Sequence, residues 1–285
     1  MQLTKNQILR ILRSMKKMPF QRPLKPIYRY LLVMVGKQSV VQGAKVYTLQ
    51  RAKDSTKYMN IRGKTVLAVG CNTGYDCRYF IELGAGEVHG VDIIDEIGAN
   101  YAHPHVKYHQ MSVEAMDLKS ESYDLVFSCA TFEHVPRIDL AFPEMVRVTK
   151  PKGIIYCVAD PLWNSRQGHH KGAFFENYPW IHLRLSRDEI LEYCKEKGIT
   201  DPTGEHSMEA HVDYMLDSKF FNKMPAEQYV SICNNLKGVE ILMNELYFED
   251  KQYLTPKIYA ELEPKGYQLE ELLAVRHTFI ARKLK

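Results

Sequence analysis

The sequence predicts an α/β fold built on a mostly parallel sheet with helices on both faces. Short apolar runs alternate with helical patterns from about residue 64 to residue 198, which is typical of strand–helix–strand units. A turn containing two glycines, Gly70 and Gly74, follows the first apolar run, and Asp92 ends the second. At 285 residues the chain is long enough for one large domain with additions.

The expected elements follow one another in a regular order. Strands are predicted near residues 64–70, 87–92, 105–111, 122–129 and 153–159. Helices are predicted near residues 75–83, 95–101, 138–149 and 186–198. The last helix has a capping-box start, Ser186 with Glu189 three residues later, and Gly198 can close it. Two late apolar runs, over residues 239–247 and 272–282, predict two further strands.

The first 53 residues differ in charge from the rest of the chain. They hold twelve Lys and Arg residues and no acid, whereas the remaining 232 residues hold 26 basic and 34 acidic ones. We expect residues 1–59 to form a basic helical arm or lid, ahead of a domain over residues 60–285. One-sided positive charge suits an anionic partner such as an acidic glycan, a nucleotide-linked substrate, a lipid surface or a nucleic acid. Packing against the acidic body of the same chain explains the charge equally well.

Two segments, residues 160–185 and 200–230, exceed the usual length of a connection. We expect them to be substrate-cap insertions at the carboxyl edge of the sheet, where ligands bind. The first holds Trp163 and Trp180, which can stack on a sugar ring or a base, or pack in a core. No run approaches the ~18 apolar residues of a membrane span. The six cysteines form no Cys-x-x-Cys pair, so we expect a reduced, cytoplasmic protein with no transmembrane segment.

The stretch from residue 66 to residue 76 predicts a nucleoside site. An apolar run, two glycines and a helical pattern indicate a buried strand, a tight turn and a helix N-terminus. Backbone can approach a ligand closely at Gly70 and Gly74, because glycine lacks Cβ. Asp92, at the end of the next strand, can accept hydrogen bonds from both hydroxyls of a ribose.

The spacing of this turn argues against a dinucleotide. A pyrophosphate site would carry Gly-x-Gly-x-x-Gly, but Asn72 and Tyr75 stand where the second and third glycines would be. Asp76 follows at the helix N-terminus, where an acid suits the helix dipole but would repel a phosphate. A ligand that carries an ammonium and a sulfonium suits this turn better.

These motifs resemble the S-adenosylmethionine (SAM) site of class I methyltransferases. The likeness continues through residues 122–128, 132–135 and 147–153, which are similar to a small-molecule, type 11-like subfamily with an "-EHV-" strand end and an "RVLKPGG" turn. It covers roughly residues 60–160 and the late strands. The resemblance implies a Rossmann-like, seven-stranded sheet whose final strand is antiparallel, and SAM as the cofactor. A Rossmann-like domain without a nucleotide is the alternative.

The resemblance implies a role for individual residues. Asp92 would bind the ribose and Ile93 would pack on the adenine, unless Asp92 is a helix-cap or surface acid. Ser112 stands where the subfamily has an acid that faces the adenine amine, and Glu114 is a nearby substitute. Ser128 would face the amino-acid part of the cofactor. The expected cofactor-binding set is Val69, Gly70, Cys71, Asn72, Gly74, Asp92, Ile93, Ser112, Val113 and Ser128.

Candidate catalytic residues follow the fourth and fifth strands. In the subfamily the pair Glu133 and His134 often lines the acceptor side, so His134 is a candidate general base, with a structural histidine as the alternative. His169 and His170 can converge on the same mouth. Some ubiquinone-pathway and small-RNA methyltransferases bind a divalent metal through a Glu-x-x-Glu-His strand end plus a later histidine. Here Ala130 replaces the first Glu, which leaves a conceivable three-ligand site.

The sequence therefore predicts a SAM-dependent methyltransferase that acts on a hydroxyl of a small molecule or glycan. Residues 163–170 and 179–183 are loosely similar to bacterial methyltransferases of surface-polysaccharide and natural-product pathways. One alternative is an RNA or nucleotide methyltransferase that uses the basic arm to bind phosphates. Another is a SAM-binding or partner-binding module without catalytic activity.

Overall fold

The computed structural model describes residues 46–201, 204–217 and 219–285. Most of the basic arm, residues 1–45, lies outside this part, and so do the helices expected within it. The first described element is a helix over residues 46–55, followed by a turn, and it lies within the helical arm expected over residues 1–59.

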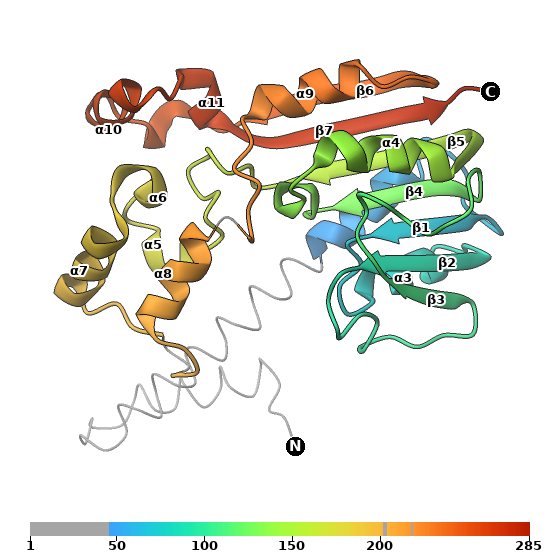
Figure 1. Cartoon of the computed structure of the whole chain (residues 1–285), viewed down its shortest axis with the longest axis horizontal. Coiled ribbons are helices and arrows are strands. Elements are labelled where there is room, and N and C mark those ends of the chain that lie inside the picture. Colours follow the sequence, from blue (N-terminus) through green and yellow to red (C-terminus); the bar gives the residue numbers. More distant parts are fainter. Residues whose placement is uncertain (1–45, 202–203, 218) are drawn as a thin grey trace, which may run out of the picture.

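Among the described residues, seven strands form one sheet in the order β3-β2-β1-β4-β5-β7-β6 (Figure 1). The strands are β1 (Thr65–Val69), β2 (Glu87–Asp92), β3 (Val106–Gln110), β4 (Tyr123–Cys129), β5 (Thr149–Ala159), β6 (Val239–Phe248) and β7 (Ala274–Lys283). The first five are parallel, and β7 is antiparallel to its neighbours β5 and β6. This confirms the predicted seven-stranded, mostly parallel sheet with an antiparallel final strand.

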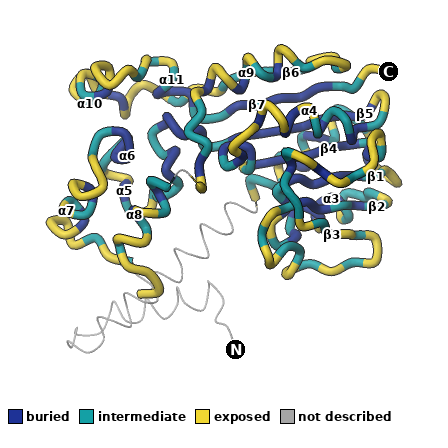
Figure 2. The backbone as a smooth tube through the Cα atoms, in the orientation of Figure 1, coloured by how far each residue is buried: buried dark blue, intermediate teal, exposed yellow. Residues whose placement is uncertain are grey.

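Helices cover both faces of this sheet. On one face lie α4 (Ile138–Val148) and α9 (Ala226–Asn234), where Phe142 packs edge-on against Phe279 with ring centroids 5.4 Å apart. On the other lie α3 (Tyr75–Glu82) and the helix over residues 46–55, where Phe80 packs against Phe127 at 5.0 Å. Burying each such ring contributes roughly 1.5–3 kcal/mol. The central strands β1 and β4 are therefore almost entirely buried (Figure 2).

A second group of helices lies beyond the carboxyl ends of the parallel strands (Figure 1). It contains α5 (Gly172–Phe175), α6 (Ile181–Arg184), α7 (Arg187–Lys197), α8 (Met208–Leu216), α10 (Pro256–Leu262) and α11 (Leu269–Leu273). The predicted capping box of α7 is confirmed: Ser186 accepts from the Glu189 N–H, the Glu189 carboxylate accepts from the Ser186 N–H, and Gly198 ends the helix. Within the described part of the chain, none of the helices combines the length and apolar character needed to cross a bilayer.

One expected helix and two expected strand boundaries were wrong. Residues 95–101 form turns rather than a helix, because the N–H groups of Gly98 and Asn100 donate to the carbonyls of Asn72 and Thr73 in the glycine turn. Strand β5 begins at residue 149, four residues earlier than expected, because Tyr123 at the start of β4 already pairs with Thr149. Residues 272 and 273, expected in the last strand, complete α11 instead.

Candidate active site

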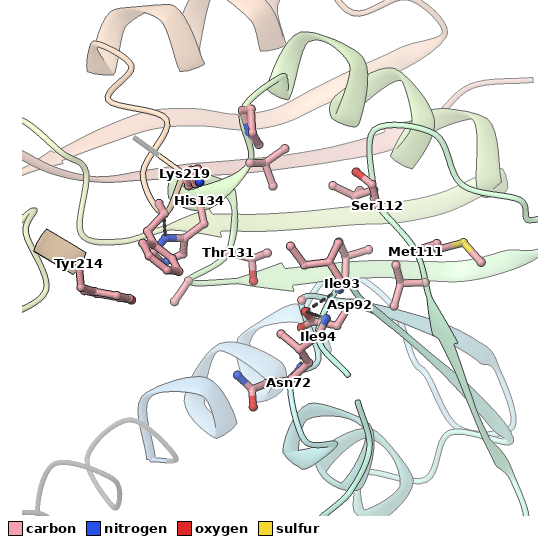
Figure 3. Close-up of a pocket in the computed structure, with 18 residues that line it drawn as sticks. Asn72, Asp92, Ile93, Ile94, Met111, Ser112, Thr131, His134, Tyr214 and Lys219 are labelled. Carbon is pink, nitrogen blue, oxygen red and sulfur yellow. Dashed lines mark hydrogen bonds between the residues drawn. The ribbon is translucent and has the colours of Figure 1, made fainter. Parts of the chain in front are cut away.

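A cavity of about 360 Å³ opens at the carboxyl ends of β1, β2 and β4. It lies under the second group of helices, which we call the cap. Its volume falls in the range of roughly 300–1,000 Å³ that is usual for small-ligand sites. Figure 3 shows two groups of side chains in it, with Asp92, Ile93 and Asn72 on one side, His134, Tyr214 and Lys219 on the other, and Thr131 between them.

The glycine turn between β1 and α3 forms one wall of this cavity. Gly70 has a φ of +73°, and its N–H donates to the carbonyl of Val91 at 2.7 Å, which ties the turn to β2. A Cβ at Gly70 would overlap the side chain of Thr131. A Cβ at Gly74, where φ is +102°, would overlap the hydroxyl of Tyr108. Both positions therefore need glycine for their backbone conformation and for close protein contacts.

Asp92 is the group that joins the turn to the end of β2. Its Oδ2 accepts a hydrogen bond from the backbone N–H of Asn72 at 2.8 Å. Its Oδ1 accepts from the N–H of Ile93, also at 2.8 Å. Oδ1 also accepts a longer hydrogen bond of 3.4 Å from the N–H of Ile94. Three amides thus hold the carboxylate in one orientation at the cavity wall, and Oδ2 keeps a lone pair for a ligand.

The structure brings seven of the ten expected cofactor-binding residues to this cavity, namely Val69, Gly70, Asn72, Asp92, Ile93, Ser112 and Val113. Ile93 is 71 % exposed, so it offers an apolar surface for a ring to cover. The other three do not line the cavity. Cys71 is buried against Cys77 and Gly90, and Gly74 faces Tyr108. Ser128 is fully buried, and no described group hydrogen-bonds to its hydroxyl.

Other lining residues were not expected from the sequence. Ala130 and Thr131 stand before Phe132 and the "-EHV-" segment, and Val135 and Pro136 end and follow it. That motif therefore marks the region without fixing which side chains face the cavity. Tyr214, Lys219 and Phe220 come from the insertion over residues 200–230, where no local pattern singles them out. The set missed comprises Val91, Ile94, Met111, Ala130, Thr131, Val135, Pro136, Tyr214, Lys219 and Phe220.

Three predicted catalytic residues meet at the cap side of the cavity. One potential ligand atom from each of Glu133, His134 and His170 lies within 4.8 Å of the other two. The rings of the two histidines are 4.9 Å apart, and His134 Nε2 lies 3.8 Å from Glu133 Oε1. His134 itself lines the cavity.

Backbone carbonyls orient both imidazoles. His134 Nδ1 donates to the carbonyl of Phe220, and His170 Nε2 makes a longer hydrogen bond of 3.4 Å to the carbonyl of Pro161. Burial lowers the pKa of His134, and burial together with the charge of His134 lowers the pKa of His170 to about 4. Near neutral pH each imidazole is therefore uncharged, with one nitrogen free to accept a proton or bind an ion.

The carboxyl group of Glu133 is buried and poorly hydrogen-bonded by the described residues. Only 2 % of the residue is exposed, and neither carboxylate oxygen accepts a well-formed hydrogen bond from any described group. Burial raises the pKa of Glu133 well above its ordinary range, although the N–H groups of Glu133 itself and Asp160 lie close enough to oppose the shift. Its side chain and two neutral imidazoles are a donor set that suits a divalent ion.

The structure separates His169 from this group, which corrects the expectation that both neighbouring histidines reach the mouth. His170 adopts a left-handed backbone conformation with a φ of +58°, and His169 is 1 % exposed. Its ring packs against His182 and Phe175 inside the cap, with centroids 4.9 and 5.7 Å away. His169 therefore supports the cap rather than the cavity.

The tryptophans also pack in the cap rather than offering a stacking surface. Trp180 is fully buried and donates its indole N–H to the carbonyl of Asn164 at 3.1 Å. Trp163 is 7 % exposed and packs against His182 and Phe221. Of the two readings open from the sequence, the structure supports core packing for both.

Comparison with known proteins gives a family match and several distant relatives. Residues 67–157 match the family model described as "Methyltransferase domain". A ubiquinone biosynthesis O-methyltransferase from Bartonella bacilliformis is 27 % identical over 110 residues, which are 36 % of this chain and 44 % of that protein. An uncharacterized methyltransferase from Mycobacteroides abscessus is 33 % identical over 118 residues, 39 % of this chain and 45 % of that protein. The chain thus spans less than half the length of these relatives.

Among solved structures, an S-adenosylmethionine dependent methyltransferase from Mesorhizobium loti aligns with a TM-score of 0.48 at 14 % identity. The alignment covers 79 % of this chain and 93 % of that one.

Proposed function

Because residues 67–157 belong to the methyltransferase-domain family, whose cofactor is SAM, we propose that this protein methylates a hydroxyl group of a small molecule or glycan. The observation that carries the proposal is Asp92, which lies at the wall of the cavity with three backbone amides fixing its carboxylate. When bound, SAM supplies a methyl group on a sulfonium, which is ready for transfer to a nucleophile.

The residues around the cavity suit that cofactor. Oδ2 of Asp92 keeps a lone pair beyond the Asn72 amide, and Oδ1 binds the Ile94 N–H only at 3.4 Å, so the carboxylate can accept hydrogen bonds from both ribose hydroxyls. The exposed side chain of Ile93 and the neighbouring Met111 offer apolar contacts to the adenine. Ser112 and Val113 lie in the same wall and can meet the edge of the base.

The decisive test is cofactor binding by isothermal titration calorimetry. We expect the purified protein to bind SAM or S-adenosylhomocysteine in the micromolar range, and Asp92→Ala to abolish detectable binding. Asp95→Ala is a matched control, because Asp95 is an exposed acid that does not line the cavity. Unchanged affinity in Asp92→Ala would refute the ribose assignment, and no binding by the wild type would refute the function.

The acceptor side of the cavity supports base catalysis by His134. A hydroxyl needs help to lose its proton, and a positioned base typically contributes about 10²–10⁴-fold. His134 donates from Nδ1 to Phe220, so its Nε2 is the free nitrogen, and burial keeps the ring neutral. Lys219 lies at the same end of the cavity and adds a positive charge, which favours an acceptor with an anionic group.

A second candidate is methyl transfer assisted by a divalent ion, and the uncompensated carboxylate of Glu133 favours it. Glu133, His134 and His170 would hold the ion, and the ion would lower the pKa of the acceptor hydroxyl. The two mechanisms exclude each other, because His134 has a single free nitrogen. Activity that survives dialysis against EDTA would support the base, and activity restored only by added Zn²⁺, Mn²⁺ or Mg²⁺ would support the ion.

We also infer a reducing, cytoplasmic environment from the cysteines. All six are free and buried, where they act as small apolar side chains.

A further inference from the structure

The segment that carries His134 is held by one residue of the insertion over residues 200–230. Asn222 donates from its side-chain Nδ2 to the carbonyl of Phe132 at 2.8 Å and to the carbonyl of Val135 at 3.0 Å. Its backbone N–H donates to the carbonyl of Glu133 at 3.1 Å. Three carbonyls on the two sides of His134 therefore meet a single residue, which lies 90 positions beyond Phe132 in the chain.

The neighbours of Asn222 fix the direction of its amide. The backbone N–H of Met224 lies 3.0 Å from Asn222 Oδ1, and a backbone N–H can only donate. Oδ1 is therefore the acceptor, and Nδ2 is the donor that faces the carbonyls. The buried hydroxyl of Tyr229 in α9 also lies 2.8 Å from Nδ2. The amide is thus anchored both to its own loop and to a helix that packs on the sheet.

The two residues before Asn222 contact the imidazole of His134. The carbonyl of Phe220 accepts from His134 Nδ1, and the buried ring of Phe221 packs against the imidazole with centroids 5.2 Å apart. Because a carbonyl can only accept, Nδ1 carries the proton of the neutral ring and Nε2 does not. A shift of about 1 Å would take the carbonyl of Phe220 out of hydrogen-bond range of Nδ1.

We propose that Asn222 is a positioning residue for methyl transfer, because it holds the carbonyl of Phe220 against His134 and so keeps Nε2 of the imidazole unprotonated. This inference rests on the proposed function, in which Nε2 takes the proton of the acceptor hydroxyl as its oxygen receives the methyl group. The side chain of Asn222 joins the two segments whose relative position decides where the imidazole proton sits. It acts through His134 and does not line the cavity itself.

Nitrogen NMR of the imidazole tests the assignment without an acceptor substrate. In protein labelled with ¹⁵N-histidine, the ¹⁵N shift separates a protonated ring nitrogen from an unprotonated one. The variant His134→Gln identifies the His134 signals by their loss. In EDTA near neutral pH we expect the wild type to hold His134 mainly in its Nδ1–H form. Asn222→Ala should lower the ratio of Nδ1–H to Nε2–H about 2- to 10-fold, the usual value of one neutral hydrogen bond.

Two further variants separate positioning from general support of the fold. Asn244→Ala is the matched control, because Asn244 is also half-buried and its Nδ2 donates to two acceptors at 2.9 and 2.8 Å. Its Oδ1 lies 2.7 Å from His277 Nε2, so this variant should move the signals of His277 and leave those of His134 unchanged. Tyr229→Phe removes one partner of the Asn222 amide and keeps the carbonyls, so it should lower the His134 ratio less than Asn222→Ala does.

A wild-type His134 protonated mainly at Nε2, or an equal ratio in Asn222→Ala and the wild type, would overturn the role of Asn222. If Asn222→Ala does not fold, Tyr229→Phe decides, and an unchanged ratio there overturns it. S-adenosylhomocysteine should bind Asn222→Ala with wild-type affinity, since Asn222 does not line the cavity. A wild-type protein that fails to bind S-adenosylhomocysteine would instead refute the proposed function, whatever the tautomer of His134.

Discussion

Replacing Glu133 with Gln should stabilise the protein when no metal is present. Glu133 is 2 % exposed and its oxygens accept no well-formed hydrogen bond from the described residues, so burial raises its pKa well above the ordinary 4.5. Protonating at pH 7 a carboxyl group whose ordinary pKa is 4.5 costs the folded protein at most about 3.4 kcal/mol. Gln has nearly the same shape and carries no charge, so we expect a gain of about 1–3 kcal/mol in the free energy of unfolding.

The pH dependence of that gain identifies its cause. The folded protein binds a proton at Glu133 that the unfolded chain releases above about pH 4.5, so the wild type loses stability as pH rises through this window. The advantage of Glu133→Gln should be near zero at pH 4.5 and grow by at most about 1.4 kcal/mol per pH unit above it. Urea unfolding in EDTA at several pH values measures it, and the exposed Glu196→Gln is the control.

Added metal should reverse the order of stability. A divalent ion at 100 times its dissociation constant stabilises the folded wild type by about 2.7 kcal/mol. The variant lacks the carboxylate ligand and should gain far less from Zn²⁺ or Mn²⁺. A variant less stable than the wild type in EDTA at pH 7 would show that a protein group compensates the carboxylate. An equal response to metal in both proteins would place the ion elsewhere.

Two further variants test the acceptor side and the glycine turn. His134→Ala should lower turnover at least 100-fold while S-adenosylhomocysteine still binds with wild-type affinity; full activity would make His134 structural. Gly70→Ala should weaken S-adenosylhomocysteine at least tenfold, because φ is +73° and the new Cβ would overlap Thr131. Adding Thr131→Ala should recover part of this loss by removing the overlap, and strictly additive effects on binding would contradict that explanation.

The fold was predictable where local patterns determine structure. The central parallel strands β1 and β4 are short apolar runs, and Ser186 with Glu189 marks the start of a helix within four residues of sequence. The expected helix over residues 95–101 failed because its backbone N–H groups bond to residues 72 and 73 instead, and no spacing within the segment reveals that partner.

The cofactor side of the candidate site was easier to predict from the sequence than the acceptor side. Gly70, Asn72 and Asp92 lie within 23 residues of one another and follow consecutive strands, so strand order alone brings them to one edge. The acceptor side combines His134 with Phe220, which are 86 positions apart. Phe220, Tyr214 and Lys219 come from an insertion whose packing depends on the whole cap.

The sequence by itself determined the sheet, the glycine turn and the acid that follows the second strand, because these depend on hydrophobic periodicity and on backbone conformations open to glycine. The tertiary structure alone decided that His170 rather than His169 joins Glu133 and His134, and that the Glu133 carboxyl group is buried beside these two imidazoles. Which charges lose their water, and which of two neighbouring side chains faces a cavity, depends on contacts between distant segments that exist only once the chain has folded.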